Sequence, residues 1–315
     1  MTTPITAPLT TDVTIIGLGP MGLTLADLML KAGRTVTLWN RSPGKAKELV
    51  ARGAALAATP AAAIAASPLS ILILFDYAAA DAVLRSDGVT AALRGRLVAN
   101  LGTGSPEDAK DAAACIAASG GRYLDGAIQA APSQMGQPDT PVLVSGPRAV
   151  FDEALPLLKI LAGNPAWLGE KIEAAAVMDL ATLSYVYGAY AGFLHGARIA
   201  EAVGIDVAGF GSIVNDISPS FGAFFRHEGN VIQSGDFTIS ESPLRISVTA
   251  VDRILRESRR LGINSELPEL VNGWLQRAER AGLADQELAV LIKVLRDSGD
   301  VVLPKPLQAM VQAVV

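Results

Sequence analysis

The chain has 315 residues, of which 50% are hydrophobic and 18% are charged, and it carries a net charge of -5. This balance excludes a disordered chain, and the acidic charge excludes the basic surface that nucleic acid or an anionic membrane would need. The single cysteine excludes an internal disulfide and a zinc site made of cysteines. With only two histidines, a metal site made of several histidines is also disfavoured, so no bound metal is expected. Residues 1–11 lack the features of a secretory signal, and no apolar run reaches the length of a membrane span, which predicts a soluble, cytoplasmic protein.

The first half of the sequence alternates between strand-like and helix-like segments. Strands are predicted at 12–17, 34–39, 71–75, 96–100, 123–125 and 141–144, and helices at 21–31 and 42–52. Gly33 fits the C-terminal cap of the first helix, and Ser42 is placed to cap the second at its N-terminus. Such alternation predicts an α/β fold with a doubly wound parallel sheet, and we assign a Rossmann-type domain to residues 1–168.

The second half is predicted to be helical throughout. Residues 170–203 hold no proline and few charges, so we predict a long connector helix, bounded as 169–203, that is apolar on nearly all sides. Further helices are predicted at 207–215, 244–261, 267–281, 285–298 and 306–315, which together form a helical domain over 204–315. Because such a connector needs partners beyond the remaining helices, we expect an intertwined homodimer in which this domain contacts substrate and partner.

A glycine-rich turn follows the first predicted strand. Gly17-Leu18-Gly19-Pro20-Met21-Gly22 matches G-x-G-x-x-G between a strand and a helix. The first glycine permits the tight turn, the second lets the backbone approach a pyrophosphate, and the third allows close packing of helix and strand. A glycine turn with a purely structural role is the alternative, and the flanking strand and helix argue against it. The turn therefore predicts a bound dinucleotide.

The end of the second strand indicates which dinucleotide is bound. A site that prefers NAD has an acidic residue about 20 residues after the glycines, which accepts from the ribose 2′-OH. This chain has Asn40, Arg41, Ser42 and Lys45 there, which offer hydrogen-bond donors and two positive charges to a 2′-phosphate. The alternative is that Ser42 only caps a helix while Arg41 and Lys45 are solvated. We predict NADP(H) as the cofactor.

A further loop, Asn100-Leu101-Gly102-Thr103-Gly104, follows the strand at 96–100. It is expected at the carboxyl edge of the sheet, where ligands bind in open α/β folds. Asn100 is predicted to meet the nicotinamide or the substrate, and Thr103 to contact the cofactor. An ordinary turn-forming asparagine is the alternative for Asn100.

The connector helix lacks a residue on which some dehydrogenases depend. In 3-hydroxyacid dehydrogenases of this two-domain plan, a lysine near the start of the connector is the proton source, but no lysine occurs here between Lys171 and Lys293. Asp179 and Tyr187 lie eight residues apart and therefore roughly on one face of the helix. A carboxylate and a phenol there suit a cationic iminium, because a tyrosine hydroxyl stays protonated at neutral pH and can donate to the substrate. Packing of the tyrosine in the core is the alternative.

Other polar side chains of this half are assigned no chemistry. His195 is expected to be a hydrogen-bonded packing residue. Asp216, His227 and Glu228 lie in sequence typical of a loop and are expected to be solvated.

These motifs resemble the imine reductase family, which is related to the 3-hydroxyacid dehydrogenases. The resemblance rests on the glycine turn, Asn40-Arg41-Ser42, Asn100-Leu101-Gly102-Thr103-Gly104, Leu124-Asp125-Gly126-Ala127-Ile128, Asp179-Leu180-Ala181 and Tyr187-Gly188-Ala189-Tyr190-Ala191-Gly192-Phe193-Leu194-His195-Gly196. It implies NADPH-dependent reduction of cyclic imines, with reductive amination of a ketone by an amine as a further activity. It also implies a cleft between the Rossmann domain of one subunit and the helical domain of its dimer partner.

The resemblance also implies roles for single residues. Family members have aspartate or tyrosine at the position of Tyr187, and some with reductive aminase activity combine that tyrosine with an acidic residue at Asp179 and an asparagine at Asn100. An aromatic wall of the substrate pocket is expected from Phe221, Phe224 and Phe225. Two alternatives stay open at this stage: a carbonyl reductase like the 3-hydroxyacid dehydrogenases, and a non-catalytic NADP-binding protein.

Overall fold

The computed structural model describes residues 10–297, so the helix predicted at 306–315 lies outside the described residues. The chain divides into two compact units, a first and a second, which meet in the sequence between Tyr185 and Val186. Among the described residues, no helix combines the length and the apolar character that a membrane crossing requires.

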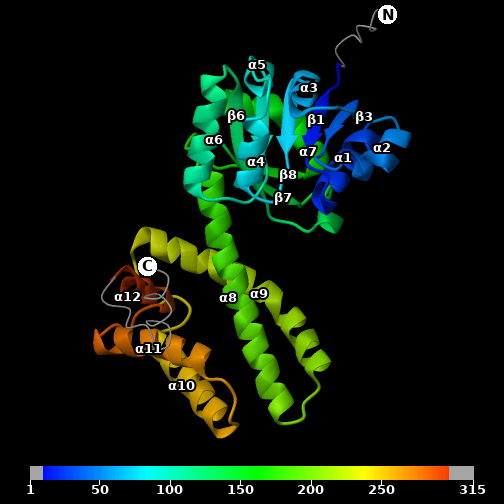
Figure 1. The fold of residues 1–315 in the computed structure, drawn as a ribbon. Helices are drawn as coiled ribbons and strands as arrows, with labels where there is room; N and C mark the ends of the chain where they lie inside the picture. The colour runs from blue at the N-terminus through cyan, green and yellow to red at the C-terminus, as the bar shows by residue number, and fades with distance from the viewer. Residues whose placement is uncertain (1–9, 298–315) are drawn as a thin grey trace, which may run out of the picture. The chain divides into compact units, whose positions relative to one another are not determined.

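The first unit contains one sheet of eight strands in the order β3-β2-β1-β4-β5-β6-β7-β8 (Figure 1). All neighbouring strands are parallel except β6 and β7, which pair antiparallel. The bounds are β1 Val13–Ile16, β2 Val36–Trp39, β3 Ala55–Leu56, β4 Leu69–Leu72, β5 Leu97–Asn100, β6 Arg122–Ile128, β7 Pro141–Ser145 and β8 Asn164–Trp167. The predicted α/β fold with a doubly wound, mostly parallel sheet is therefore confirmed.

Helices cover both faces of this sheet. Because side chains alternate along a strand, Ile15 of β1 packs into the core on one face, with α1 and α7, and Ile16 into the core on the other, with α3, α4, α5 and α6. The bounds are α1 Pro20–Lys31, α2 Lys47–Ala51, α3 Pro60–Ala65, α4 Tyr77–Leu84, α5 Val89–Ala92, α6 Pro106–Ala118 and α7 Arg148–Leu161, with short 3-10 turns η1 Pro43–Ala46 and η2 Pro132–Gln134. Gly33 adopts φ +74° just after α1, as expected of a C-terminal cap.

Two strands and one strand direction differ from the prediction. β3 has only two residues and β8 contains Pro165, which suits an edge strand, so neither carries a strong strand signal. β7 runs antiparallel to β6 because only a loop with the short η2 turn joins them, and no crossover helix returns the chain to the starting edge. The strand predicted at 71–75 lies at Leu69–Leu72, and the chain leaves the sheet after it.

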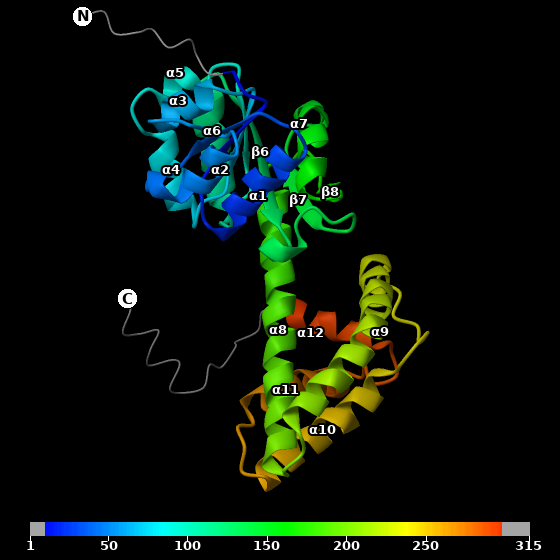
Figure 2. The ribbon, with the colours of Figure 1, turned by 90° about the vertical axis from the view of Figure 1, so that its right-hand side faces the viewer.

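Helices make up the second unit. The long helix α8 (Ala174–Ala202) begins in the first unit and runs unbroken into the second (Figure 2). It is followed by α9 Val207–Ser234, α10 Leu244–Arg260, α11 Glu266–Arg280, η3 Leu288–Leu291 and α12 Ile292–Arg296. The helix predicted at 207–215 is too short, because α9 continues through Pro219 to Ser234. Asp206 caps α9 through the amides of Ala208 and Gly209, and the helix continues to Gly235, whose φ is +73°.

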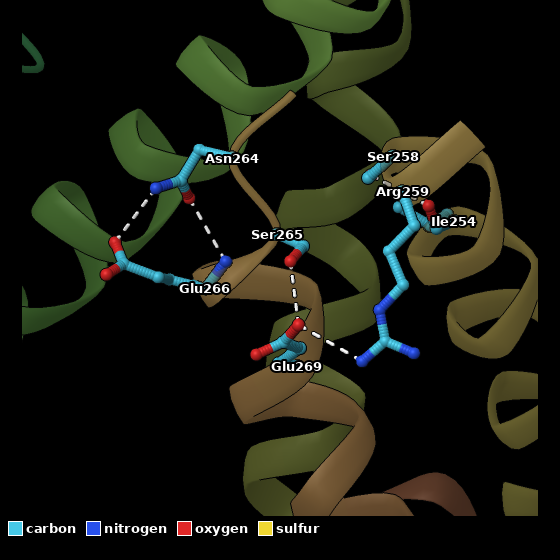
Figure 3. Close-up of polar contacts among 7 residues, drawn as sticks. All are labelled: Ile254, Ser258, Arg259, Asn264, Ser265, Glu266 and Glu269. Atoms are coloured by element: carbon cyan, nitrogen blue, oxygen red, sulfur yellow. Dashed lines mark hydrogen bonds and ion pairs between the residues drawn. The ribbon is translucent and has the colours of Figure 1, made fainter. Parts of the chain in front are cut away.

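The turn between α10 and α11 is held by polar side chains (Figure 3). Asn264 Oδ1 accepts from the backbone amide of Glu266 at 3.0 Å, and its Nδ2 donates to the Glu266 carboxylate at 3.0 Å. Ser265 and Arg259 both donate to Glu269, at 2.7 and 3.1 Å. These contacts fix the start of α11 against the end of α10.

Candidate functional site

The glycine turn between β1 and α1 has the geometry of a phosphate-binding loop. Gly17 adopts φ +103°, and a Cβ there would lie 2.2 Å from the carbonyl oxygen of Ile73. A Cβ on Gly22 would lie 1.9 Å from the carbonyl oxygen of Gly17, whereas one on Gly19 would meet nothing within 4 Å. The first and third glycines are therefore required by packing, and the second leaves open space above the backbone. Pro20 starts α1, whose first amides face the same turn and can receive a pyrophosphate.

Asn40 joins this turn to the end of β2. Its Oδ1 accepts from the backbone amide of Leu18 at 2.9 Å, and its Nδ2 donates to the carbonyl oxygen of Ser42 at 3.0 Å. Ser42 occupies the N-cap position of η1, as predicted, but its side chain makes no capping hydrogen bond. The hydroxyl of Ser42 and the cations of Arg41 and Lys45 are exposed beside the turn. This donor set fits a 2′-phosphate.

Asn100 ends β5 at the carboxyl edge of the sheet, opposite Asp125 of β6 in the strand register. Only 1% of Asn100 is exposed, and its Oδ1 accepts from the amide of Gly102 at 3.2 Å. Its Nδ2 is buried without a hydrogen-bond partner. Thr103 follows in the loop and is exposed. The edge thus presents an amide donor that the described protein atoms leave unsatisfied.

A buried carboxyl group next to Asn100 was not singled out as a site residue from the sequence. Asp125 accepts hydrogen bonds from the hydroxyls of Tyr77 and Tyr123, the latter at 2.9 Å. Burial raises the pKa of Asp125 to about 6, although the two hydroxyls act in the opposite direction. Burial and the charge of Asp125 also raise the pKa of Tyr77 and Tyr123. Tyr77 is remote in the sequence, so no spacing signal could have joined it to Asp125.

Asp179 lies on the part of α8 that belongs to the first unit and is only 4% exposed. Its Oδ1 accepts from Nε2 of Gln129 at 2.6 Å, and its Oδ2 is buried without a hydrogen bond. Oε1 of Gln129 accepts from the Thr182 hydroxyl at 2.8 Å. Neither Gln129 nor Thr182 was singled out from the sequence. The available signals were the place of Gln129 directly after β6 and the spacing of Thr182 three residues after Asp179 on one helix.

The aromatic candidates lie on helices of the second unit. Tyr187 of α8 is 68% exposed, so it does not pack in the core of this chain. Phe221, Phe224 and Phe225 lie on α9, where the ring centroids of Phe221 and Phe225 are 6.1 Å apart and those of Phe224 and Phe225 are 5.5 Å apart. They form one aromatic cluster on a helix. Their role as a pocket wall stays a prediction.

Both histidines have hydrogen-bond partners within the second unit. Nε2 of His195 lies 3.2 Å from the hydroxyl of Ser258, which is the packing role expected of it. His227 and Glu228 were expected in a solvated loop, which is wrong, because both lie on α9 and Glu228 is only 8% exposed. Asp216 lies on the same helix and is exposed.

Glu228 is buried because α9 packs against η3, next to a second carboxylate, Glu287. Side-chain ligand atoms of His227, Glu228 and Glu287 lie within 4.8 Å of one another. The Glu287 oxygens already accept from the backbone amides of residues 240, 241 and 242, at 2.6, 2.8 and 3.0 Å. These donors surround Glu287 as they would an anion, and they disfavour a cation there.

Comparison with known proteins places these features in a family. Two family models match the chain: the NAD binding domain of 6-phosphogluconate dehydrogenase over residues 12–169, and the C-terminal domain of NADPH-dependent reductive aminase-like proteins over residues 172–297. The chain is 29% identical over 286 residues to the NADPH-dependent reductive aminase of Aspergillus oryzae, which covers 90% of this chain and 96% of that protein.

Relatives of known structure include reductive aminases and imine reductases with somewhat higher sequence identity to this chain. The reductive aminase from Aspergillus terreus in complex with NADPH4, cyclohexanone and allyl amine has a TM-score of 0.82 and 34% identity, over 91% of this chain and 99% of that one. This chain belongs to the reductive aminase and imine reductase family. The imine reductase from Myxococcus stipitatus in complex with NADP+ has a TM-score of 0.83 and 30% identity, over 90% and 99% of the two chains. The resemblance drawn from the sequence motifs is therefore confirmed.

Membership of the reductive aminase and imine reductase family also bears on the cofactor. The solved relatives hold NADPH4 or NADP+, which agrees with the cofactor predicted from Asn40 to Lys45. In this chain, the open backbone at Gly19 and the exposed donors at the end of β2 fit such a dinucleotide.

Proposed function

We propose that this chain is an NADPH-dependent imine reductase that converts cyclic imines and iminium ions to amines and joins ketones to amines by reductive amination. One observation carries the proposal: Asn100 Nδ2 and Asp179 Oδ2 are both buried and both lack a hydrogen-bond partner. An unsatisfied buried polar atom costs about 1–3 kcal/mol. In the first unit, this donor and this acceptor lie where the family resemblance expects substrate or cofactor contacts, so both are available to a ligand.

The chemistry of the residues supports this reading. When bound, NADPH supplies the hydride that reduces the carbon of the C=N bond. The Asp179 carboxylate pairs with the positive charge on nitrogen, and the Asn100 amide orients the nicotinamide or the substrate. Tyr187 donates the proton that a neutral imine needs at nitrogen, a step for which a general acid contributes about 10²–10⁴-fold. The complex of the relative from Aspergillus terreus with cyclohexanone and allyl amine supports the ketone-plus-amine reaction.

The test is the Tyr187→Phe variant with a small cyclic imine as substrate. We expect kcat/KM to fall about 100-fold or more, while the Kd of NADPH stays within about twofold. Ser184→Ala, which removes an exposed hydroxyl from the same helix, is the control and keeps its activity. Equal losses in turnover and NADPH binding would remove Tyr187 from the mechanism.

The same assays separate the alternatives. Oxidation of 3-hydroxyisobutyrate in place of imine reduction would make the chain a carbonyl reductase of the 3-hydroxyacid dehydrogenase type. NADPH oxidation that no cyclic imine stimulates, unchanged in Tyr187→Phe, would leave a cofactor-binding protein without this activity.

We propose that Arg41 selects the phosphorylated cofactor, with Ser42 and Lys45 beside it. Arg41→Ala should raise KM for NADPH about 10- to 100-fold, the value of a charge-assisted pair with phosphate, and leave KM for NADH within about twofold. Arg34→Ala removes an exposed cation at the opposite end of β2 and is the matched control. An equal rise for both cofactors would contradict the assignment.

We further propose a homodimer that uses α8 and α9 of the second unit. Large apolar side chains are exposed along both helices, among them Val186, Tyr190, Leu194, Ile213 and Ile217. Such a surface is unfavourable in water and typical of an interface. Size-exclusion chromatography with light scattering should show a dimer, and a stable monomer would contradict it.

We also propose domain bounds at 1–168, 169–203 and 204–315, of which the last part serves substrate binding and dimerisation. We propose the cytoplasm as the location of the protein. The free thiol of Cys115 is compatible with a reducing compartment. Limited proteolysis and cell fractionation check these two assignments.

A further inference from the structure

Gln129 connects the end of the sheet to the first turns of α8. It follows β6, which ends at Ile128 at the carboxyl edge of the sheet. Its side-chain amide contacts two residues of the helix: Nε2 donates to Asp179 Oδ1 at 2.6 Å, and Oε1 accepts from the Thr182 hydroxyl at 2.8 Å. Both ends of one amide are thus used, and all three residues belong to the first unit.

The orientation of this amide follows from its partners. An ionised carboxylate only accepts hydrogen bonds, so the NH₂ group of Gln129 faces Asp179 and its carbonyl oxygen faces Thr182. The Thr182 hydroxyl has one proton and three acceptors in reach, namely Gln129 Oε1 and the carbonyl oxygens of Met178 and Asp179. Donation to Gln129 fixes the amide in the orientation in which it serves Asp179.

The consequence for Asp179 is asymmetric. One carboxylate oxygen is bound to Gln129, and the other is buried with no hydrogen bond. Without Gln129 the two oxygens would be equivalent, and the side chain would be free to rotate about its last bond. Fixing a reacting group in one orientation contributes to rate, because a misplacement of about 1 Å costs on the order of 100-fold.

We propose that Gln129 is a positioning residue of this site, which holds Asp179 so that Oδ2 is presented to the substrate nitrogen, and that Thr182 orients Gln129. The assignment rests on the proposed function for the identity of the nitrogen ligand. The link from Gln129 to Asp179 stands on the contacts alone and can be tested without turnover.

The test uses Gln129→Met, which keeps the length of the side chain and removes both hydrogen bonds. With cyclohexanone, allyl amine and NADPH, we expect kcat/KM for allyl amine to fall about 10- to 100-fold, as for other changes to groups that orient a ligand-binding side chain. KM for NADPH should stay within about twofold. Gln137→Met is the matched control, because it makes the same substitution at an exposed position in the loop between η2 and β7. It should retain wild-type kinetics.

Thr182 provides a second pair of variants in case Gln129→Met folds poorly. Thr182→Val removes the hydroxyl at nearly constant volume and should lower kcat/KM for allyl amine about three- to tenfold, the value of one neutral hydrogen bond. Thr182→Ser keeps the hydroxyl and should restore wild-type values. A merely structural role would lower the melting temperature and change the kinetics for NADPH and allyl amine alike.

A crystal structure of Gln129→Met with NADP+ gives a readout that does not depend on activity. We expect the Asp179 carboxylate in more than one rotamer, and binding of the product N-allylcyclohexylamine weakened about tenfold or more. An Asp179 side chain in its single original orientation, with amine binding within twofold of wild type, would overturn the proposal. A wild type that neither reduces imines nor binds the amine would instead overturn the proposed function, whatever the rotamer of Asp179.

Discussion

Two buried carboxyl groups, one in each unit, have pKa values that are shifted in opposite directions. Burial raises the pKa of Asp125 to about 6. Burial acts in the same direction on Glu287, yet the backbone amides around it lower its pKa to about 2. Asp125 is 1% exposed and Glu287 is fully buried, so exposure does not explain the difference.

The two pKa shifts differ in direction because the two carboxyl groups have different hydrogen-bond donors. Asp125 receives two tyrosine hydroxyls, both on the same oxygen. Glu287 receives three consecutive backbone amides and the hydroxyl of Ser240, distributed over both oxygens. Backbone amides are held in place by the fold, and several of them stabilise a carboxylate strongly. The charged form is therefore favoured where the backbone is arranged to receive it.

The largest effect is expected for Glu287→Gln. The new NH₂ group would face backbone donors, and charge-assisted hydrogen bonds worth about 1.5–3 kcal/mol each would be lost. We expect the free energy of unfolding at pH 7 to fall by about 4 kcal/mol, measured by urea denaturation of the full chain. Glu241→Gln, an exposed neighbour, is the control and should change it by less than about 0.5 kcal/mol.

The pH dependence of this effect has a definite sign. Because the pKa of Glu287 is lowered in the folded state, its contribution is present above pH 4.5 and is lost as the pH falls toward 2. The difference between wild type and Glu287→Gln should therefore shrink below pH 4.5. A difference that is unchanged at pH 3 would contradict this account.

A smaller effect of opposite sign is expected for Asp125→Asn. The raised pKa means that the folded state holds a proton more tightly than the unfolded chain, so wild-type stability falls as the pH rises from about 4 to about 6. At about 1.4 kcal/mol per pKa unit the fall is about 3 kcal/mol. The variant lacks this slope, so relative to wild type it gains that amount between pH 4 and pH 7.

Urea unfolding at pH 4.5 and 7.5 checks this expectation. Asp139→Asn, at an exposed position of the same unit, is the control and should keep the wild-type slope. Parallel pH profiles for wild type and Asp125→Asn would show that Asp125 does not carry the shift.

The smallest effect is expected for Tyr77→Phe. Removing the hydroxyl costs about 1.5 kcal/mol, the lower end of the range for a hydrogen bond to a charged group, because Tyr123 still donates to the same oxygen. It should also move the pKa of Asp125 further upward, because that hydrogen bond lowers it. The descending part of the stability profile would then end above pH 6, which unfolding at pH 6 and pH 8 detects. If the pH at which the stability stops falling were unchanged in Tyr77→Phe, the Tyr77 hydroxyl would have no effect on the pKa of Asp125, and burial alone would account for its shift.

Much of the first unit could be predicted because its signals are local. The alternation of strands and helices, the glycine turn and the donors from Asn40 to Lys45 are all read within short windows of sequence. The edge strands β3 and β8 escaped prediction, since two residues or a proline-containing segment give no period to detect. The full length of α9 was not predicted, because Pro219 and several glycines are weak helix formers and the apolar period is clear only over 207–215.

Some residues of the candidate site could likewise be predicted from the sequence, and others could not. Asn100 and Asp179 could be proposed from strand ends, helix spacing and family resemblance. Gln129, Thr182 and Tyr77 were not proposed, because the hydrogen bonds that give them a role join residues remote in the sequence, and the local signals for Gln129 and Thr182 are weak.

By itself the sequence determined the cofactor turn, the family and the reaction class, because each depends on residue types at short, fixed spacings. Only the tertiary structure decided which buried groups are satisfied. It shows that one oxygen of Asp179 accepts a hydrogen bond while the other is buried without one, and that Asp125 and Glu287 differ in their donors. The physical reason is that desolvation and hydrogen bonding depend on what the fold brings within about 3 Å, which no spacing along the chain specifies.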